Sequence, residues 1–412
     1  MNNMKSQVRG DEALFRQVQK LLNFFVLFLP IGIVKIAGIS ITFFIYLLIV
    51  YRFFKYGKKL FRLKSTTDYL IVLFFMVLIL SIVFSEPTYR PLVVEKDAVT
   101  IVRLIYWMTL ALFIKTWIHR FNFFKLSKYF FYGTIFMIVF YYTVNSKLEI
   151  LTQNSFAFSL VVSAPISLYY IFKKYRFPVV IIFSSMFMFF GLMSGSRAGA
   201  ILIVVQIVIL LLSGGYIKKK TMLFLGTTIF PIILLLSWMN LQEIRVEVAN
   251  IIKSYNPDTA ELILNPEKVN MIDKSWLDRK QMIVKGSIIF KEHPFLGIGF
   301  SHYKYYWVDM PIISPYLNKS MYFYNRLSAH NSYIQVLAGA GIFALALLLL
   351  IEFIILKKSV KILLEFEMKQ EIFIATSFIG MIIYFYVIAA MMGAITWLIF
   401  GLGLSLLENN HV

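Results

Sequence analysis

Apolar windows of about 20 residues recur along this chain, and they constrain its fold more than any other feature of the sequence. A bilayer core of roughly 30 Å requires about 20 apolar residues in each helical span. Membrane strands would instead alternate apolar and polar side chains over about ten residues, and runs such as 200–212 do not alternate. The windows and the mean hydropathy of +0.76 therefore predict an all-α integral membrane protein.

About twelve transmembrane helices are expected, forming a single polytopic membrane domain over residues 1–412. Both termini are expected in the cytoplasm, because Lys and Arg collect in short loops on the side of the N-terminal segment. The polar opening of the chain does not resemble a cleavable signal peptide. The predicted spans are 21–36, 38–54, 67–85, 99–117, 127–144, 155–173, 178–194, 199–214, 221–240, 332–356, 371–390 and 392–407.

The net charge of +20 does not indicate a nucleic-acid partner. Most of the positive excess lies in the short loops and the N-terminal segment, where it sets the orientation of the spans and attracts anionic lipid. The sequence contains no basic groove with interleaved aromatic residues. It also contains no cysteine, which excludes thiolate chemistry, disulfides and cysteine metal sites.

One large extracytoplasmic loop, 241–330, is predicted between the ninth and tenth spans, and chemistry is expected there. It contains His293, His302 and His330, three of the five histidines of the chain. Apolar and charged residues alternate with a helical period from Ser275 onward, and Pro294 predicts that this helix ends nearby. An amphipathic helix of this kind is expected to lie on the membrane surface.

Two arginines are candidates for binding an anion. Arg197 lies between two apolar spans, flanked by small residues that would let a bulky anion approach the backbone, and guanidinium binds phosphate bidentately. Arg279 lies early in the predicted loop helix, where the helix dipole also favours an anion. Each has an ordinary alternative: Arg197 as a turn residue of a helical hairpin, and Arg279 as a solvated loop residue.

His330 begins the tenth predicted span, where the polar loop meets apolar helix. Histidine, with an ordinary pKa of about 6.5, is the usual proton acceptor at neutral pH. Asn331 would orient its imidazole, or Asn331 and Ser332 would simply cap the helix. The loop has no ligand spacing typical of a metal site, and 296–300 has two of the three glycines of a dinucleotide fingerprint. Neither a metal nor a cofactor is therefore expected.

Three separated motifs together resemble the bacterial O-antigen ligase and O-antigen polymerase superfamily. The first is the Ser-Arg-small run at 194–199, and the second is Arg279 followed by the His-Pro and Gly-x-Gly residues of 293–299. The third is His330-Asn331, then nine residues, then Gly341. Three positions after this glycine ligases have Gly, Thr or Tyr, but this chain has Ala344, which leaves ligase and polymerase as alternatives.

The resemblance implies a GT-C-like membrane glycosyltransferase that uses undecaprenyl-diphosphate-linked glycans. Arg197 and Arg279 would hold the donor diphosphate and stabilise the leaving group. His330 would take the proton of the acceptor hydroxyl as that oxygen attacks the anomeric carbon. Further substrate-binding residues would be Ser196, His293 and Asn331.

The expected function is therefore an O-antigen ligase-type reaction without a metal. A glycan would move from undecaprenyl diphosphate to a hydroxyl of lipid A core or another surface acceptor, on the external face of the bacterial cytoplasmic membrane. The alternative is a polymerase that joins lipid-linked repeat units. A polysaccharide or lipid transporter is a remote alternative, because the two halves of the chain show no symmetry and the notable charges gather at the outer surface.

Overall fold

The computed structural model describes residues 2–30, 35–36, 39–85, 94–145, 151–194, 196–213, 274–312, 320–365, 369–391 and 393–408. Their regular structure is helical apart from one antiparallel hairpin of two short strands, β1 (Lys35–Ile36) and β2 (Ile39–Ser40). The all-α prediction is therefore confirmed. The predicted ninth span, 221–240, and much of the predicted loop, 241–273 and 313–319, lie outside the described residues.

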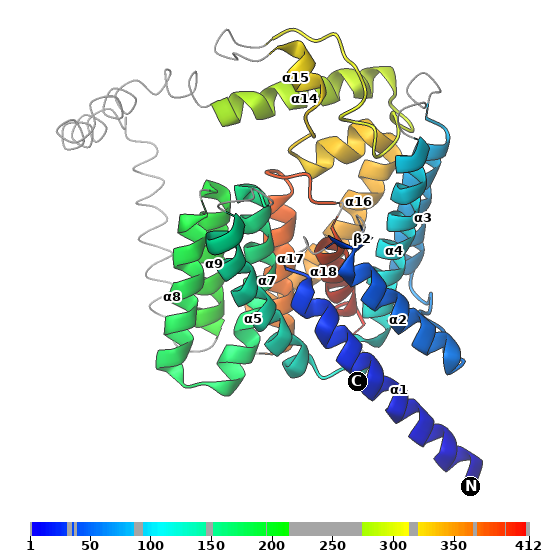
Figure 1. Ribbon diagram of the computed structural model, residues 1–412, viewed down its shortest axis with the longest axis vertical. Helices are drawn as coiled ribbons and strands as arrows, with labels where there is room; N and C mark the ends of the chain where they lie inside the picture. Colours follow the sequence, from blue (N-terminus) through cyan, green and yellow to red (C-terminus); the bar gives the residue numbers. More distant parts are fainter. Residues whose placement is uncertain are drawn as a thin grey trace, which may run out of the picture.

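The other predicted spans overlap helices that run back and forth through one bundle (Figure 1). Five described helices are long and apolar enough to cross a membrane, as expected of a multi-pass membrane protein, and four apolar ones are shorter. The total of about twelve spans stays a prediction. The helices are α1 (Asn2–Phe28), α2 (Ile41–Lys55), α3 (Thr66–Val83), α4 (Val94–Trp117), α5 (Phe123–Phe140), α7 (Gln153–Lys174), α8 (Phe177–Met193), α9 (Arg197–Ser213), α16 (Ser332–Glu365), α17 (Gln370–Tyr384) and α18 (Ala394–Ser405).

The first predicted span, 21–36, has the wrong limits. Helix α1 begins at Asn2 and ends at Phe28, and the last two positions of the predicted span form β1 instead. Leu14, Val18 and Leu22 are fully buried at a helical spacing. The helix therefore begins before the apolar window, because one face of its polar opening also packs on the protein.

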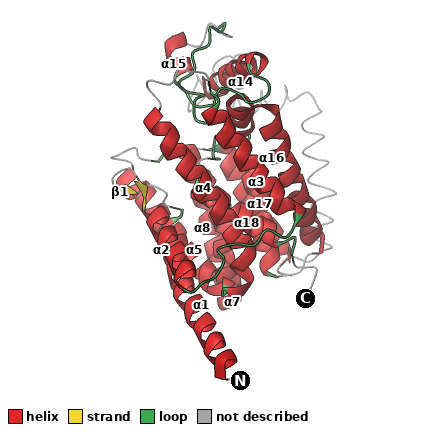
Figure 2. Cartoon of the chain, turned by 90° about the vertical axis from the view of Figure 1, so that its right-hand side faces the viewer, coloured by secondary structure: helices red, strands yellow, loops and turns green. Residues whose placement is uncertain are grey.

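The two ends of the bundle differ (Figures 1 and 2). One, here called the loop end, is covered by α14 (Lys274–Glu292) and α15 (Met321–Asn325). The opposite end, here called the N-terminal end, is where α1 begins. Glu408, just after α18, forms a 3.1 Å ion pair with Lys115 near the end of α4. Helices α4 and α18 therefore end on the same side of the bundle.

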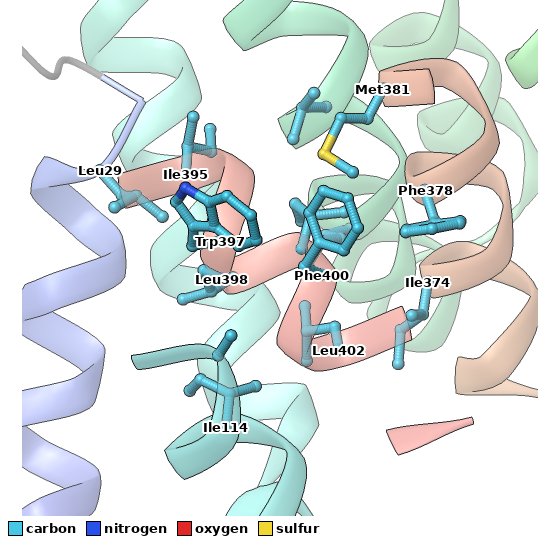
Figure 3. Close-up of a cluster of buried hydrophobic side chains, with 14 of the residues drawn as sticks. Leu29, Ile114, Ile374, Phe378, Met381, Ile395, Trp397, Leu398, Phe400 and Leu402 are labelled. Atoms are coloured by element: carbon cyan, nitrogen blue, oxygen red, sulfur yellow. The ribbon is translucent and has the colours of Figure 1, made fainter. Parts of the chain in front are cut away.

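Helix α18 lies at the centre of the bundle core (Figure 3). Its Trp397 and Phe400 rings stack with centroids 4.9 Å apart, and Phe378 of α17 meets Phe400 edge-on at 5.5 Å. A Cβ at Gly401 would come within 2.7 Å of the Ala111 carbonyl oxygen of α4. Close packing of small residues thus joins α18 to α4, as is usual between membrane helices.

Helix α16 folds back on itself at Gly341, so the predicted span 332–356 is not one continuous helix. Gly341 has φ 79° and ψ −174° inside the helix. In a straight helix Tyr333 and Glu352 would be about 28 Å apart, at 1.5 Å per residue. Instead the Tyr333 hydroxyl donates a 3.1 Å hydrogen bond to Oε2 of Glu352. Residues 332–340 and 342–365 therefore form a helical hairpin.

The loop helix predicted from Ser275 is confirmed as α14, which ends at Glu292, two residues before Pro294. Part of its apolar side packs on protein, and its position on the membrane surface stays a prediction. Met282 and Ile289 are fully buried in a second hydrophobic cluster, here called the loop core. The other buried members of the loop core are Ile298, Tyr303, Tyr306, Val308, Met310, Tyr324, Ala329 and Ala338.

Candidate functional site

Tyr384, the last residue of α17, joins two of the three motifs at the loop end of the bundle. Its hydroxyl is hydrogen-bonded to Oγ of Ser196 at 2.7 Å and donates to the Asn154 carbonyl at 3.3 Å. The charge of Arg279, on α14, lies within electrostatic range of this hydroxyl. The fold therefore brings the charge of Arg279 near the hydroxyl that contacts Ser196, the residue before α9.

Ser196 serves as the N-cap of α9. Its side chain is buried, and its Oγ accepts a 3.4 Å hydrogen bond from the Gly199 backbone N–H. Arg197 is the first residue of α9, at the positive end of the helix dipole. A Cβ at Gly199 would meet Cβ of Ala157 at 2.7 Å. Gly199, two positions after Arg197, thus allows α9 to pack on α7, and does not expose the backbone as the sequence had suggested.

His330 lies between two attachments that hold it at the same end of the bundle. On its N-terminal side, the Tyr324 hydroxyl donates a 2.8 Å hydrogen bond to Oδ1 of Asp278, the neighbour of Arg279. On its C-terminal side, the Ser332 N–H donates to the carbonyl of Phe385 at 2.8 Å, next to Tyr384. The third motif is therefore connected to both of the others.

The Ser332 hydroxyl strengthens the second attachment. It donates to the Ile388 carbonyl at 2.7 Å and accepts from the Ala390 N–H at 3.0 Å. The start of α16 is thus fastened to the segment that joins α17 to α18.

The backbone of His330 is in the left-handed region, with φ 50°. Among the described residues it is the only one other than glycine with a positive φ. This conformation is uncommon for a residue with a side chain, and such strain clusters at active sites. The half-buried His330 is thus held in an unusual backbone geometry by the contacts on either side.

Asn331 caps the first turn of α16. Its Oδ1 accepts a 3.0 Å hydrogen bond from the Ile334 N–H, and its Nδ2 donates to the Tyr386 carbonyl at 3.3 Å. These contacts correspond to the helix-capping alternative. Its proposed roles in substrate binding and in orienting the imidazole stay predictions.

The Gly-x-Gly run of the second motif pairs with the break in α16. The N–H groups of Ile298 and Gly299 donate to the carbonyls of Ala338 and Gly339, at 3.1 and 2.9 Å. Gly297 and Gly299 have φ 63° and 102°. A Cβ at Gly297 would lie 2.5 Å from the Gly339 carbonyl carbon. These glycines therefore permit backbone contact between the loop and the folded-back helix.

His293 lies at the far end of α14 from Arg279. Glu292 is 13 positions after Arg279, so the two residues are about 20 Å apart along the helix. The His293 Nε2 is 2.9 Å from the Tyr306 hydroxyl, which donates to Glu292 at 3.2 Å. These three side chains line a cavity of about 310 Å³. The structure does not bring His293 together with Arg279, and its role in substrate binding stays a prediction.

Comparison with known families decides the identity of this region. A family model described as O-antigen ligase matches residues 177–349. Residues 177–349 are an O-antigen ligase family domain. The resemblance seen in the three motifs is thereby confirmed. No curated protein matches the chain closely enough to be called a relative.

Two residues outside the O-antigen ligase family domain hold it in place, and sequence reasoning missed both. Tyr384 contacts Ser196, as described above. Asp97 of α4 accepts from the loop, since its Oδ1 is 2.7 Å from Nε2 of the buried His302 and 3.3 Å from the Ser301 hydroxyl. The His302 Nδ1 is 2.8 Å from the Ile298 carbonyl oxygen. In the sequence, the only sign of a role for Asp97 and Tyr384 is that each is a polar residue near one end of an apolar helix.

Lys285 is a buried basic residue of the O-antigen ligase family domain. Its Nζ donates 2.8 Å hydrogen bonds to the carbonyls of Tyr303 and Asn325 and lies 4.9 Å from the Tyr303 ring centroid. Its side chain is fully buried, and this burial lowers the pKa of Lys285 to about 7. Lys285 thus fastens α14 to the two segments that precede His330.

Exposure separates the aromatic residues of the domain into two groups. Tyr303 and Tyr324 are buried in the loop core, where they cannot stack on a ligand. Trp307 and Tyr322 are about half exposed, with ring centroids 6.2 Å apart. The guanidinium of Arg326 lies 4.1 Å from the Tyr322 ring centroid. This exposed pair offers a surface on which a sugar could stack.

Proposed function

We propose that this protein is an O-antigen ligase-type glycosyltransferase that moves a glycan from undecaprenyl diphosphate to an acceptor hydroxyl. The reaction would take place at the loop end of the bundle, on the external face of the bacterial cytoplasmic membrane. The acceptor would be lipid A core or another surface molecule. One observation carries this proposal: Tyr384 and the segment after it connect Ser196 to Asn331 and Ser332, next to His330, and the charge of Arg279 acts on the Tyr384 hydroxyl.

The diphosphate would bind between Arg197 and Arg279. Both guanidinium groups stay charged at any physiological pH, and each can bind two phosphate oxygens. The start of α9 adds the positive end of its dipole. These groups suffice to offset the charge of the leaving diphosphate, so the reaction is proposed to need no metal.

His330 would act on the acceptor hydroxyl. As the acceptor oxygen forms its bond to the anomeric carbon, the bond from that carbon to the diphosphate oxygen breaks. The bonding electron pair leaves with undecaprenyl diphosphate, and the hydroxyl proton passes to the His330 imidazole. Tyr384 and Ser196 would hold the start of α9 in a fixed position relative to Arg279, without touching the reacting atoms.

Ala344 does not decide between a ligase and a polymerase. Its side chain is fully buried in the bundle core, three residues after the break at Gly341. The residue type at this position therefore reflects packing next to the hairpin. The distinction must come from the acceptor that the enzyme uses.

The proposal is tested by the glycan profile of host cells that lack this chain and carry either the native sequence or His330→Ala. With the variant, long lipid-linked polymer should accumulate while transfer to the surface acceptor is lost. Accumulation of single lipid-linked repeat units would instead indicate a polymerase. A normal profile with His330→Ala, at a normal protein level, would contradict the proposed mechanism.

A further inference from the structure

A cavity of about 960 Å³ opens at the N-terminal end of the bundle, on the opposite side from Arg279 and His330. It lies between α1, the connection from α2 to α3, the short helix η2 (Ile118–Arg120) and the start of α5. We call it the basic cavity. Six cationic side chains line it: Arg16, Lys20, Lys58, Arg62, Arg120 and Lys125.

Only two carboxylates, Asp11 and Glu12, line the same cavity, and each already has a partner. Asp11 pairs with Lys58 at 2.8 Å, and Glu12 pairs with Arg16 at 3.2 Å. The other four cations form no ion pair with any acid in the part of the chain that the structure describes. The basic cavity is therefore short of negative charge.

Neutral polar groups in the basic cavity are already engaged with one another. The Gln19 side chain donates to Asn23 at 2.8 Å and accepts from the Asn122 backbone N–H at 2.7 Å. The Asn122 side chain accepts from the Lys125 backbone N–H at 2.9 Å. The three amide oxygens are thus occupied, and the donors that remain, most of them cationic, favour an anion with several acceptor oxygens.

One wall of the basic cavity is aromatic. The rings of Phe15 and Trp117 lie 5.4 Å apart, and the Trp117 indole N–H donates to the Leu60 carbonyl at 2.8 Å. The Arg62 guanidinium lies 5.6 Å from the Trp117 ring centroid. This contact keeps the guanidinium at the wall, where its planar donors are suited to a phosphate.

We infer that the basic cavity binds the phosphate of an anionic phospholipid head group. Cations that only orient the membrane spans need to lie in short loops on one side of the membrane. Orientation does not require the cations of four separate segments to line the same cavity, as they do here. Basic pockets between membrane helices bind phosphate head groups in this way. The aromatic wall and the position at the helix ends favour a lipid over a soluble anion.

The test uses the full-length protein in detergent and follows its thermal unfolding during titration with phosphatidylglycerol, phosphatidylcholine or inorganic phosphate. The variant Lys20→Gln/Arg62→Gln/Arg120→Gln removes three of the unpaired cations, all of them exposed. Its control, Lys55→Gln/Lys173→Gln/Arg176→Gln, removes three exposed cations of the same end that do not line the cavity.

Phosphatidylglycerol should raise the Tm of the native protein, and phosphatidylcholine should not. Each cation near an anionic surface contributes about fivefold to affinity, so the cavity variant should bind on the order of a hundredfold more weakly. The control should bind like the native protein. The inference would be overturned if both variants bound phosphatidylglycerol equally weakly, or if the two lipids had equal effects on Tm. It would also be overturned if inorganic phosphate bound as tightly as the lipid.

Discussion

The hydroxyls of Ser196 and Tyr384 lie 2.7 Å apart, although 188 positions separate them in the sequence. This contact joins the start of α9 to the end of α17, close to Arg279. Tyr384→Phe should therefore lower the rate of glycan transfer about tenfold, because Arg197 and Arg279 would be held less firmly in position to bind the diphosphate. The fold should lose only about 1–3 kcal/mol, because the variant removes two hydrogen bonds that contribute about 0.5–1.5 kcal/mol each.

The measurement for Tyr384→Phe is the transfer rate at saturating donor, together with the Tm. Tyr386→Phe is the matched control, because Tyr386 is two residues away and largely exposed. Native transfer by Tyr384→Phe would show that the hydroxyl contact has no part in positioning the site.

Gly341→Ala should prevent α16 from folding back. A Cβ at this position would lie 2.0 Å from the Phe295 carbonyl oxygen, and the φ of 79° with ψ −174° is accessible almost only to glycine. The cost is several kcal/mol, and size-exclusion profiles of the purified variant should show little monodisperse protein. Gly393→Ala is the control, since its Cβ would have no neighbour closer than 3.6 Å. A stable Gly341→Ala protein would disprove the hairpin.

Lys285 should make the stability of the protein depend on pH. Its pKa is about 7 when folded and near the ordinary 10.5 when unfolded. The unfolded state therefore binds more protons between these values, and stability should rise as the pH increases from about 7 toward 10. Tm measurements from pH 6 to 9.5 should show this rise of Tm with pH in the native protein. The control variant Lys291→Met, which changes an exposed lysine of α14, should show the same rise. Lys285→Met should lose this dependence of Tm on pH. If the dependence is unchanged in Lys285→Met, another titratable group causes it.

Asp97→Ala should weaken the attachment of the loop to α4. It would leave the buried His302 without its partner at Nε2, which costs about 1–3 kcal/mol. Asp97→Asn should cost less, because the amide can still form a hydrogen bond with the imidazole. Thermal unfolding of the two variants checks this order, and an equal Tm for Asp97→Ala and the native protein would refute it.

Much of the helical framework was predictable because its causes are local. Pro294 cannot continue a helix, and α14 ends two residues before it. The apolar windows placed most of the described helices, since burial in lipid or in the bundle needs a continuous apolar run. Ser196 and His330 stood out in the sequence because each borders an apolar segment, and Arg279 because it lies early in the loop helix. Their roles stay predictions.

The relations between these residues depend on distant contacts and could not be predicted. No local pattern states that Tyr384 reaches Ser196 or that His302 faces Asp97. The fold-back of α16 depends on Gly341 and on the loop residues that satisfy the broken helix, such as Pro294, whose carbonyl accepts from the Ile342 N–H at 2.9 Å. An apolar window cannot distinguish such a hairpin from a straight span.

Arg279 and His330 are proposed to act together on one lipid-linked donor. The most direct test reconstitutes the purified protein with an undecaprenyl-diphosphate-linked glycan and an acceptor, and measures release of undecaprenyl diphosphate together with glycan transfer. His330→Ala should lower both rates about 10²- to 10⁴-fold, the usual contribution of a proton acceptor. Arg279→Lys should also lower both, while Arg326→Lys, in the exposed stack on Tyr322, should leave release unchanged. Native rates of release and transfer with His330→Ala, in a folded protein, would contradict the proposal that His330 takes the proton of the acceptor hydroxyl.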